Sequence, residues 1–88
     1  MLLTFYMMFH TYILYSETKD KFYIGYTFNL DQRITLHNNG NSRSTKSGIP
    51  WKLVYHKIFE NKSDAIKREN FIKRMKSRKF ILELINNS

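Results

Sequence analysis

Apolar side chains along this chain recur with two different periods, which predict strands in some segments and helices in others. The segments 9–16 and 22–27 are rich in Tyr, Phe, Ile and Thr and are separated by a polar stretch, as expected for two antiparallel strands in a hairpin. The segment 52–60 has a similar character and predicts a third strand. The polar, basic segment 41–50 before it carries the Gly and Pro residues of a loop.

The predicted hairpin brings particular side chains together. A turn centred near Glu17 and Thr18 would place Tyr12 roughly opposite Tyr23, where cross-strand side chains meet. Tyr23 shares one face of its strand with Gly25. Because glycine has no side chain, a gap is expected there, through which a ligand or another backbone segment could approach.

Helical spacing and capping residues predict three helices. Asn29 begins the first helix, which ends at the Asn-Asn-Gly stop at Gly40. Ser63 is the predicted N-cap of a second helix that runs to about Arg74, and Ser77 caps a final helix. The predicted order is strand, strand, helix, strand, helix, helix, which is an α/β (α+β) arrangement.

Length and composition favour one folded domain. A chain of 88 residues with 42% hydrophobic residues has enough apolar surface for one core, so residues 1–88 are expected to form a single domain with its core at about 9–85. The absence of cysteine excludes disulfides and thiolate metal sites. The apolar opening run 1–9 lacks a basic start and is too short to span a membrane, so neither a signal peptide nor a membrane helix is expected.

The chain is strongly basic, and its net charge of +8 attracts polyanions. Nucleic acid is the first candidate partner; an anionic membrane and simple solubility are the alternatives that composition leaves open. Basic and aromatic residues alternate in two stretches, which is typical of phosphate contacts with occasional stacking, although lysines and arginines also solvate exposed helix faces. The candidate nucleic-acid contacts are Arg43, Lys46, Lys52 and Lys73.

Two basic groups fall on the apolar side of the first predicted helix. At about 100° per residue, Arg33 and His37 lie within an arc of apolar residues and not on the solvated face. That arc consists of Leu30, Ile34 and Leu36. The alternatives are structural, with Arg33 extending along the core and His37 a satisfied, partly buried histidine.

A carboxylate falls on the apolar side of the second predicted helix. Glu69 lies in the middle of the arc formed by Ala65, Ile66 and Ile72. An ionised carboxylate out of water costs several kcal/mol unless it is paired or binds a cation. An ion pair with Arg33, an i,i+4 pair with Lys73 and a metal site each meet this requirement, and the residues alone leave all three open.

The chain resembles the GIY-YIG nuclease family, in particular its small stand-alone bacterial members, over about residues 9–85. The triplet His10-Thr11-Tyr12 stands at the first motif, where only the tyrosine is kept, and Tyr23-Ile24-Gly25 matches the second. Arg33 follows ten residues after Tyr23 and His37 follows four residues later. An Arg-Glu pair at 68–69 completes the series.

The resemblance implies a three-stranded antiparallel sheet flanked by helices, and a role for each matching residue. Glu69 matches the metal-binding glutamate, which holds Mg²⁺ (or Mn²⁺) through one carboxylate. Tyr12 matches the tyrosine that helps to activate the attacking water, Tyr23 the one that hydrogen-bonds around the phosphate, and Arg33 the arginine that steadies charge on phosphorus. His37 is either a second polarising group or a partner of Tyr12.

Tyrosine is a poor base at neutral pH, since its ordinary pKa is about 10. A metal ion or Arg33 close to Tyr12 would have to lower that pKa if Tyr12 is to accept a proton.

The resemblance therefore implies a divalent-metal-dependent endonuclease that hydrolyses phosphodiester bonds, with DNA favoured and RNA not excluded. Little sequence specificity is expected because the chain has no room for a recognition domain, so that DNA structure or a partner protein would select the site. The expected setting is DNA repair or recombination in the cytoplasm, close to the nucleoid. The alternative is a catalytically inactive module with the same fold that binds nucleic acid or a protein partner.

Overall fold

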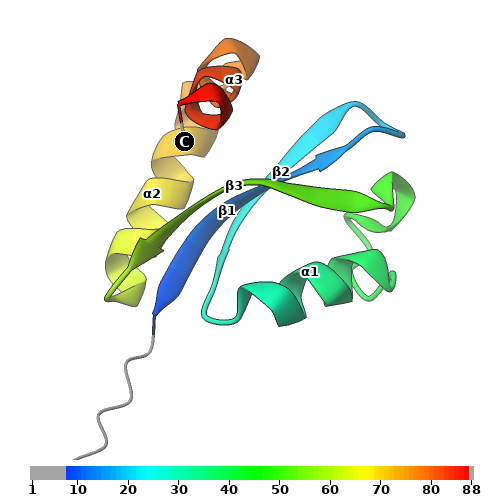
Figure 1. The fold of residues 1–88 in the computed structure, drawn as a ribbon, viewed down its shortest axis with the longest axis horizontal. Coiled ribbons are helices and arrows are strands. Elements are labelled where there is room, and N and C mark those ends of the chain that lie inside the picture. Colours follow the sequence, from blue (N-terminus) through cyan, green and yellow to red (C-terminus); the bar gives the residue numbers. More distant parts are fainter. Residues whose placement is uncertain (1–7, 88) are drawn as a thin grey trace, which may run out of the picture.

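The computed structural model describes residues 8–87, and its elements follow the predicted order (Figure 1). Residues 1–7 and 88 lie outside the described part of the chain, so most of the opening run 1–9 is not placed. Within residues 8–87, no helix is long and apolar enough to cross a membrane. The elements are β1 (Phe9–Ser16), β2 (Lys21–Thr27), α1 (Leu30–Asn38), the short 3-10 helix η1 (Lys46–Gly48), β3 (Trp51–Phe59), α2 (Lys62–Met75) and α3 (Arg78–Asn86).

The three strands form one antiparallel sheet in the order β2-β1-β3, with β1 in the centre. Figure 1 shows α1 on one side of the sheet and α2 with α3 on the other. The expected three-stranded antiparallel sheet flanked by helices is therefore confirmed.

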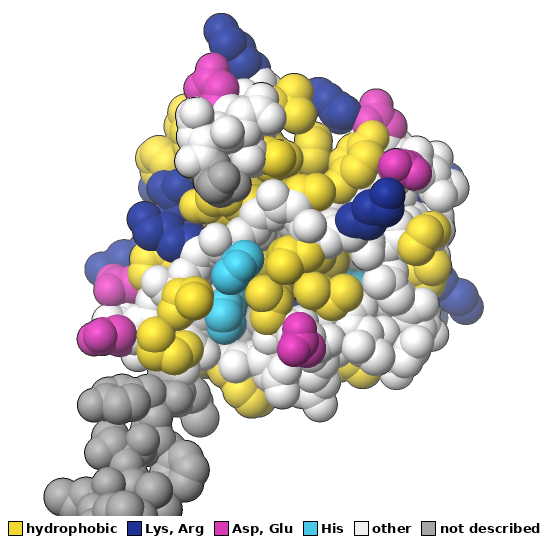
Figure 2. Space-filling model, viewed as in Figure 1, with side chains coloured by type: hydrophobic (Ala, Val, Ile, Leu, Met, Phe, Trp, Pro, Cys, Tyr) yellow, Lys and Arg dark blue, Asp and Glu magenta, His cyan; other side chains and the backbone are white. Residues whose placement is uncertain are grey.

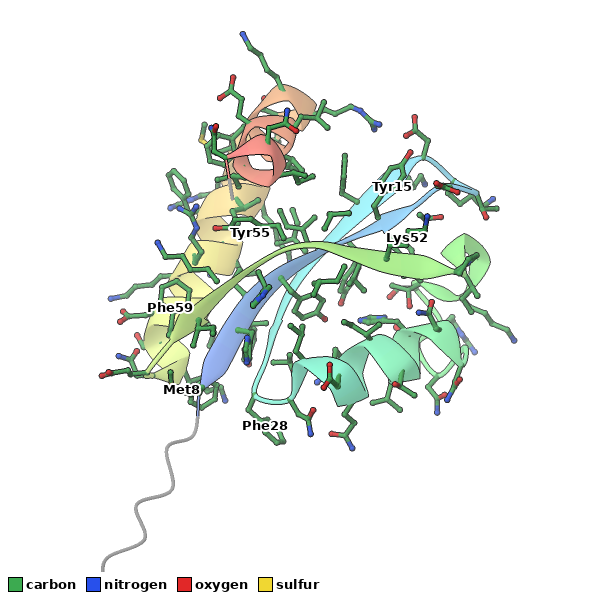
Figure 3. All side chains as sticks on the ribbon, in the orientation of Figure 1. Met8, Tyr15, Phe28, Lys52, Tyr55 and Phe59 are labelled. Carbon is green, nitrogen blue, oxygen red and sulfur yellow. The ribbon has the colours of Figure 1, made fainter. Side chains whose placement is uncertain are left out.

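Each face of the sheet has its own hydrophobic core, because side chains along β1 point alternately to the two faces. Tyr12 and Leu14 join Trp51 under α1. Ile13 joins a second cluster with Tyr55 and with residues of α2 and α3. Figure 3 shows Tyr55 between the sheet and these two helices. The central strand thus fixes the positions of the helices on both sides.

The register of the hairpin differs from the predicted one. Tyr12 pairs with Gly25 rather than with Tyr23, because Ser16 pairs with Lys21 and the turn takes all four residues between them. Asp20 closes this turn in a left-handed conformation, with φ 52°. The two tyrosines still share one face, as diagonal neighbours with ring centroids 6.2 Å apart.

Two of the three predicted N-caps are confirmed. The side chain of Asn29 accepts a hydrogen bond from the Gln32 N–H at the start of α1, and Ser77 caps α3. The N-cap of α2 is Asn61 and not Ser63, which lies in the first turn instead. The observed strands β2 and β3 each begin one residue earlier than the predicted segments.

Asn38 links the end of α1 to the start of β3. Its side-chain oxygen accepts a hydrogen bond of 2.6 Å from the Trp51 N–H, and its amide nitrogen donates one of 3.0 Å to the Trp51 carbonyl. An amide side chain thereby replaces a neighbouring strand at this point, and α1 is held against the sheet.

Replacement of Asn38 by alanine should destabilise the protein. Asn38→Ala leaves the partly buried N–H and C=O of Trp51 without partners, so we expect the free energy of unfolding to fall by about 2 kcal/mol. Urea denaturation measures this change. The exposed neighbour Asn39 offers a matched control, since Asn39→Ala should have an effect below about 0.5 kcal/mol. Equal stability of Asn38→Ala and the natural protein would contradict the assigned role.

Candidate active site

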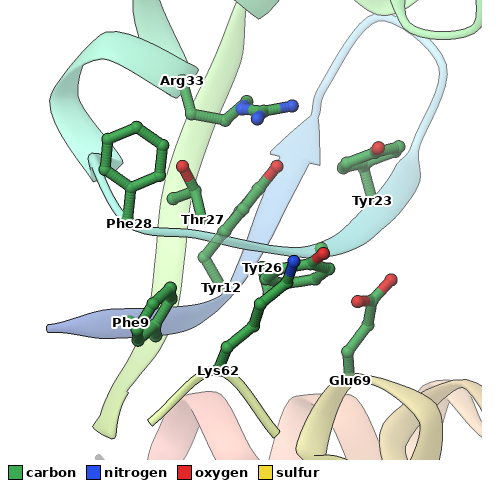
Figure 4. Close-up of a pocket in the computed structure, with 10 residues that line it drawn as sticks. Phe9, Tyr12, Tyr23, Tyr26, Thr27, Phe28, Arg33, Lys62 and Glu69 are labelled. Carbon is green, nitrogen blue, oxygen red and sulfur yellow. The ribbon is translucent and has the colours of Figure 1, made fainter. Parts of the chain in front are cut away.

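A cavity of about 570 Å³ lies where β1, β2, the turn before α1, and helices α1 and α2 meet. Figure 4 shows Tyr12, Tyr23, Arg33 and Glu69 around it, each on a different element. The lining residues are Phe9, Tyr12, Tyr23, Gly25, Tyr26, Thr27, Phe28, Arg33, Lys62 and Glu69. Four of the five residues expected in a catalytic site therefore meet at one place.

The fifth expected residue, His37, lies behind Tyr12 and does not line the cavity. It is 2% exposed, and its Nε2 is 3.2 Å from the Tyr12 hydroxyl. Of the two roles that the sequence left open for His37, this position corresponds to a partner of Tyr12.

The phenol of Tyr12 lies directly over Gly25. Tyr12 is 1% exposed, and a Cβ added to Gly25 would come within 2.7 Å of the Tyr12 hydroxyl oxygen. The gap predicted at Gly25 is therefore filled by the protein's own phenol and not left for a ligand. Glycine is required here so that Tyr12 can cross the neighbouring strand and present its hydroxyl at the cavity.

A chain of hydrogen bonds fixes the tautomer of His37. The Thr45 hydroxyl donates to the Ser42 carbonyl at 3.4 Å, so its oxygen accepts from Nδ1–H of His37 at 2.8 Å. With its proton on Nδ1, His37 accepts a hydrogen bond from the Tyr12 hydroxyl at Nε2. Tyr12 therefore donates into the protein, and the lone pairs of its oxygen remain available to the cavity.

Burial keeps both of these groups neutral. Desolvation is the main cause that raises the pKa of Tyr12; Tyr23 and Glu69 act in the same direction, and Arg33 opposes them. The pKa of His37 is lowered, again chiefly by burial and then by Arg33. The resting site does not meet the requirement that neighbouring cations lower the Tyr12 pKa, because Arg33 alone does not outweigh desolvation.

Glu69 borders the cavity and does not point into a hydrophobic core. Its side chain is 13% exposed and accepts a hydrogen bond of 2.5 Å from Lys73, one helical turn on. Of the three compensating partners that the sequence left open, the structure contains the Lys73 pair, and the described residues include no ion pair between Glu69 and Arg33.

Glu69 is the one carboxylate among the residues that line the cavity. No group of three or more His, Cys, Asp or Glu side chains suited to a metal ion occurs within residues 8–87. A single carboxylate on a polar cavity nevertheless suits Mg²⁺, which is usually held by one or two carboxylates while water and phosphate oxygens complete its shell. The Lys73 ammonium already places positive charge at this carboxylate. Glu69 therefore fits the implied metal.

Two further cations face the cavity. Arg33 lines it from α1 as an exposed residue, so the expectation that Arg33 lies away from solvent is wrong. Lys62 lines it from the first turn of α2 and was missed by the sequence analysis. The sequence feature that could have revealed Lys62 is its spacing: it precedes Glu69 by seven residues and therefore lies on the same face of the helix.

The other residues predicted to contact nucleic acid lie away from the cavity lining. Arg43 and Lys46 are exposed on the segment between α1 and β3, and Lys52 forms an exposed ion pair of 3.3 Å with Glu17. On the face in Figure 2, Lys and Arg side chains of the described residues gather mainly at the left edge, with others set apart at the top and on the right. Their contact with nucleic acid stays a prediction.

The imidazole of His37 should titrate below the ordinary value of 6.5, because its pKa is lowered by burial and by Arg33. The folded protein then binds fewer protons than the unfolded chain, so this contribution to stability is complete above pH 6.5 and is lost as the pH falls through the lowered pKa. NMR of the His37 ring protons against pH measures the midpoint directly. Arg33→Leu should raise that midpoint, and a midpoint at or above 6.5 in the natural protein would contradict the burial argument.

Comparison with known proteins places this geometry in a family. Residues 8–81 match the family model of the GIY-YIG catalytic domain. UPF0213 protein CPE1444 of Clostridium perfringens is 44% identical over 78 residues, which cover 86% of this chain and 83% of that protein. UPF0213 protein SSP2268 of Staphylococcus saprophyticus is 43% identical over 77 residues, covering 85% of this chain and 93% of that protein.

A solved structure agrees with the fold. The solution NMR structure of UPF0213 protein BH0048 from Bacillus halodurans is 30% identical, has a TM-score of 0.60, and is matched over 93% of this chain and 86% of that one. The match to the catalytic domain covers most of the chain and includes all the residues that line the cavity, as well as His37 and Lys73. This chain therefore belongs to the GIY-YIG family, among its small UPF0213 members.

Proposed function

We propose that this protein is an endonuclease that uses a divalent metal ion, Mg²⁺ or Mn²⁺, to hydrolyse phosphodiester bonds in nucleic acid, with DNA as the first candidate substrate. Membership of a family of nucleases supports the general class. The observation that carries the proposal is the convergence of two phenols, a guanidinium and a carboxylate on one cavity. Hydrolysis of a phosphodiester needs hydrogen-bond donors and positive charge at phosphorus, and a group that takes the proton of the attacking water. The phenols and the guanidinium, together with a metal ion held by the carboxylate, can meet these needs.

The cations of the cavity would position the scissile phosphate. Arg33 and Lys62 both line it, and each can pair with a non-bridging oxygen. Tyr23 lines the same cavity, and its hydroxyl can donate a hydrogen bond to the phosphate or the incoming water. Glu69 would hold the metal, which when bound supplies positive charge to the phosphate and to the leaving oxygen.

Tyr12 and His37 would move the proton of the attacking water. The phenol already donates a hydrogen bond to Nε2 of His37, so its oxygen can accept a proton from water as its own proton passes to the imidazole. This transfer avoids a free phenolate, which burial disfavours by raising the pKa of Tyr12. The water oxygen forms its bond to phosphorus while the bond from phosphorus to the leaving oxygen breaks.

The setting of the reaction is part of the same proposal. The isolated domain should show weak sequence preference, with DNA structure or a partner protein selecting the site. A role in DNA repair or recombination, in the cytoplasm and close to the nucleoid, fits the expected substrate. The domain proposed to carry this activity spans residues 1–88, with its core at about 9–85.

Replacement of Glu69 by glutamine should abolish cleavage while the fold is kept. Glu69→Gln preserves the shape of the side chain but removes its charge, so we expect the rate of plasmid or branched-DNA cleavage with Mg²⁺ or Mn²⁺ to fall by at least about 100-fold. The control is Glu83→Gln, which changes an exposed glutamate on α3 outside the cavity and should leave the rate unchanged. Cleavage that survives Glu69→Gln would rule out this site, and binding without cleavage under either metal would favour a binding module. A matched RNA substrate tests the choice of DNA.

Removal of Lys73 should make the metal site easier to fill. The ammonium of Lys73 bonds to the Glu69 carboxylate, so a metal ion has to displace it. In Lys73→Met we expect Mn²⁺, followed by electron paramagnetic resonance of the free ion, to bind at a lower concentration than in the natural protein. Lys76→Met removes the cation at the C-cap of α2, which makes no ion pair with Glu69, and controls for net charge. Weaker or unchanged Mn²⁺ binding in Lys73→Met would contradict competition at Glu69.

A further inference from the structure

The cavity has an aromatic side that the proposed hydrolysis does not use. Phe9, Tyr26 and Phe28 line it together with the candidate catalytic residues. In Figure 4, Phe9 and Phe28 lie on one side of the cavity and Tyr23 and Glu69 on the other. Phosphate recognition uses cations and hydrogen-bond donors, so carbon rings at this position need a separate explanation.

Phe28 contributes little to the hydrophobic core. It is 59% exposed, more than any other large hydrophobic residue in the described part of the chain, and it belongs to neither core cluster. Figure 3 shows it on the turn between β2 and α1. A single exposed ring is common on protein surfaces and needs no explanation by itself. Phe28 is distinguished by its position, on the wall of a cavity that also holds two cations.

The backbone on both sides of Phe28 is fixed by hydrogen bonds. The Thr27 hydroxyl accepts from the Asn29 N–H at 3.2 Å, and the Asn29 side chain accepts from the Gln32 N–H at 3.1 Å. Only the two torsions of the Phe28 side chain are left to be ordered by a ligand. Aromatic rings presented in this way bind with a small loss of conformational entropy.

The rings lie beside the cations that would hold a phosphate. The Lys62 ammonium is 6.0 Å from the centre of the Tyr26 ring, and Arg33 lines the same cavity as Phe28. A nucleotide whose phosphate pairs with Arg33 and Lys62 therefore carries its base close to these rings. In a regular duplex the faces of each base are covered by its neighbours, so stacking on a side chain requires a base that has left the stack.

We propose that the cavity selects a nucleotide that is unpaired and unstacked next to the scissile phosphate, and that Phe28 provides the surface on which that base stacks. The substrate class is then nucleic acid with single-stranded character, such as single strands, flaps and unpaired positions within a duplex. This inference rests on the proposed function, since it places the phosphate in the same cavity.

Binding experiments test this stacking without cleavage. In the Glu69→Gln background, fluorescence anisotropy compares a short single-stranded DNA, the same sequence as a perfect duplex, and a duplex with unpaired central nucleotides, all at one salt concentration. We expect the single strand and the interrupted duplex to bind more tightly than the perfect duplex. Phe28→Ala should weaken binding of the single strand by at least about fivefold, the loss expected for one base stacked on one ring. Phe28→Trp should retain binding.

A second aromatic residue and a second readout keep the test specific. Phe71 is 39% exposed on α2 and does not line the cavity, so Phe71→Ala should leave binding unchanged. On addition of single-stranded DNA, the NMR signals of the Phe28 ring should move upfield, as expected for a ring under a base. Equal affinity for single strand and perfect duplex, or equal losses in Phe28→Ala and Phe71→Ala, would overturn the inference.

The inference and the proposed function fail in different ways. Cleavage of perfect duplex that depends on Glu69 but not on Phe28 would leave an endonuclease without the stacking surface. Phe28-dependent binding of single strands by a natural protein that cuts nothing would support the stacking surface and contradict the endonuclease.

Discussion

The alternation of side chains along β1 is the constraint on which the site depends. Thr11 and Tyr12 are adjacent in the chain and point to opposite faces of the sheet. The Thr11 hydroxyl donates a hydrogen bond of 2.7 Å to the carbonyl of Ala65 in α2, and Ala65 lies one helical turn before Glu69. The same strand therefore places the phenol of Tyr12 and, through Thr11, the helix that carries the carboxylate. A shift of β1 by one residue would exchange the faces and separate the two groups.

A buried series of hydrogen-bonded polar side chains determines the resting protonation state of the site. At most 2% of the surface of each of these residues, Tyr12, His37 and Thr45, is exposed to solvent. Each is hydrogen-bonded to the next, which offsets the cost of removing their polar atoms from water. Burial also opposes a charge on either ring, since it raises the pKa of Tyr12 and lowers that of His37. With Glu69 tied to Lys73 at the same time, the resting arrangement disfavours proton transfer. A cation bound at Glu69 would make proton loss from Tyr12 easier, because it offsets the carboxylate charge, which is one of the causes that raise the Tyr12 pKa.

The sequence predicted the order of the elements because this order depends on local patterns. The periods of apolar residues and the caps at Asn29 and Ser77 are determined by residues close in the chain. The hairpin register was wrong because it depends on the length of the turn, which Asp20 sets by adopting a left-handed conformation. Asn61 and Ser63 are both good N-caps, and the geometry of the chain leaving β3 decides between them.

The candidate site was predictable in part for a similar reason. Motif spacing identified residues that the fold brings to one cavity, although their roles stay predictions. Lys62 was missed because its seven-residue spacing from Glu69 becomes informative only once Glu69 is known to face a cavity. Phe28 was missed because an exposed phenylalanine in a turn leaves no mark in a periodic pattern. The direction of the Tyr12 pKa was also missed, since it depends on how deeply Gly25 and the neighbouring strand bury the phenol.

The composition of the cavity wall bears on sequence preference. Reading a base requires donors and acceptors aimed at its edge, held at fixed positions. Here the groups on the cavity wall that are free to meet a nucleotide are mainly cations suited to phosphate and rings suited to a base face. Every base has a face that can stack, so a surface such as Phe28 distinguishes an unstacked base from a stacked one without distinguishing one base from another. Stacking on a ring would therefore account both for weak sequence preference and for selection by nucleic-acid structure. Selection by structure would then need no separate recognition domain.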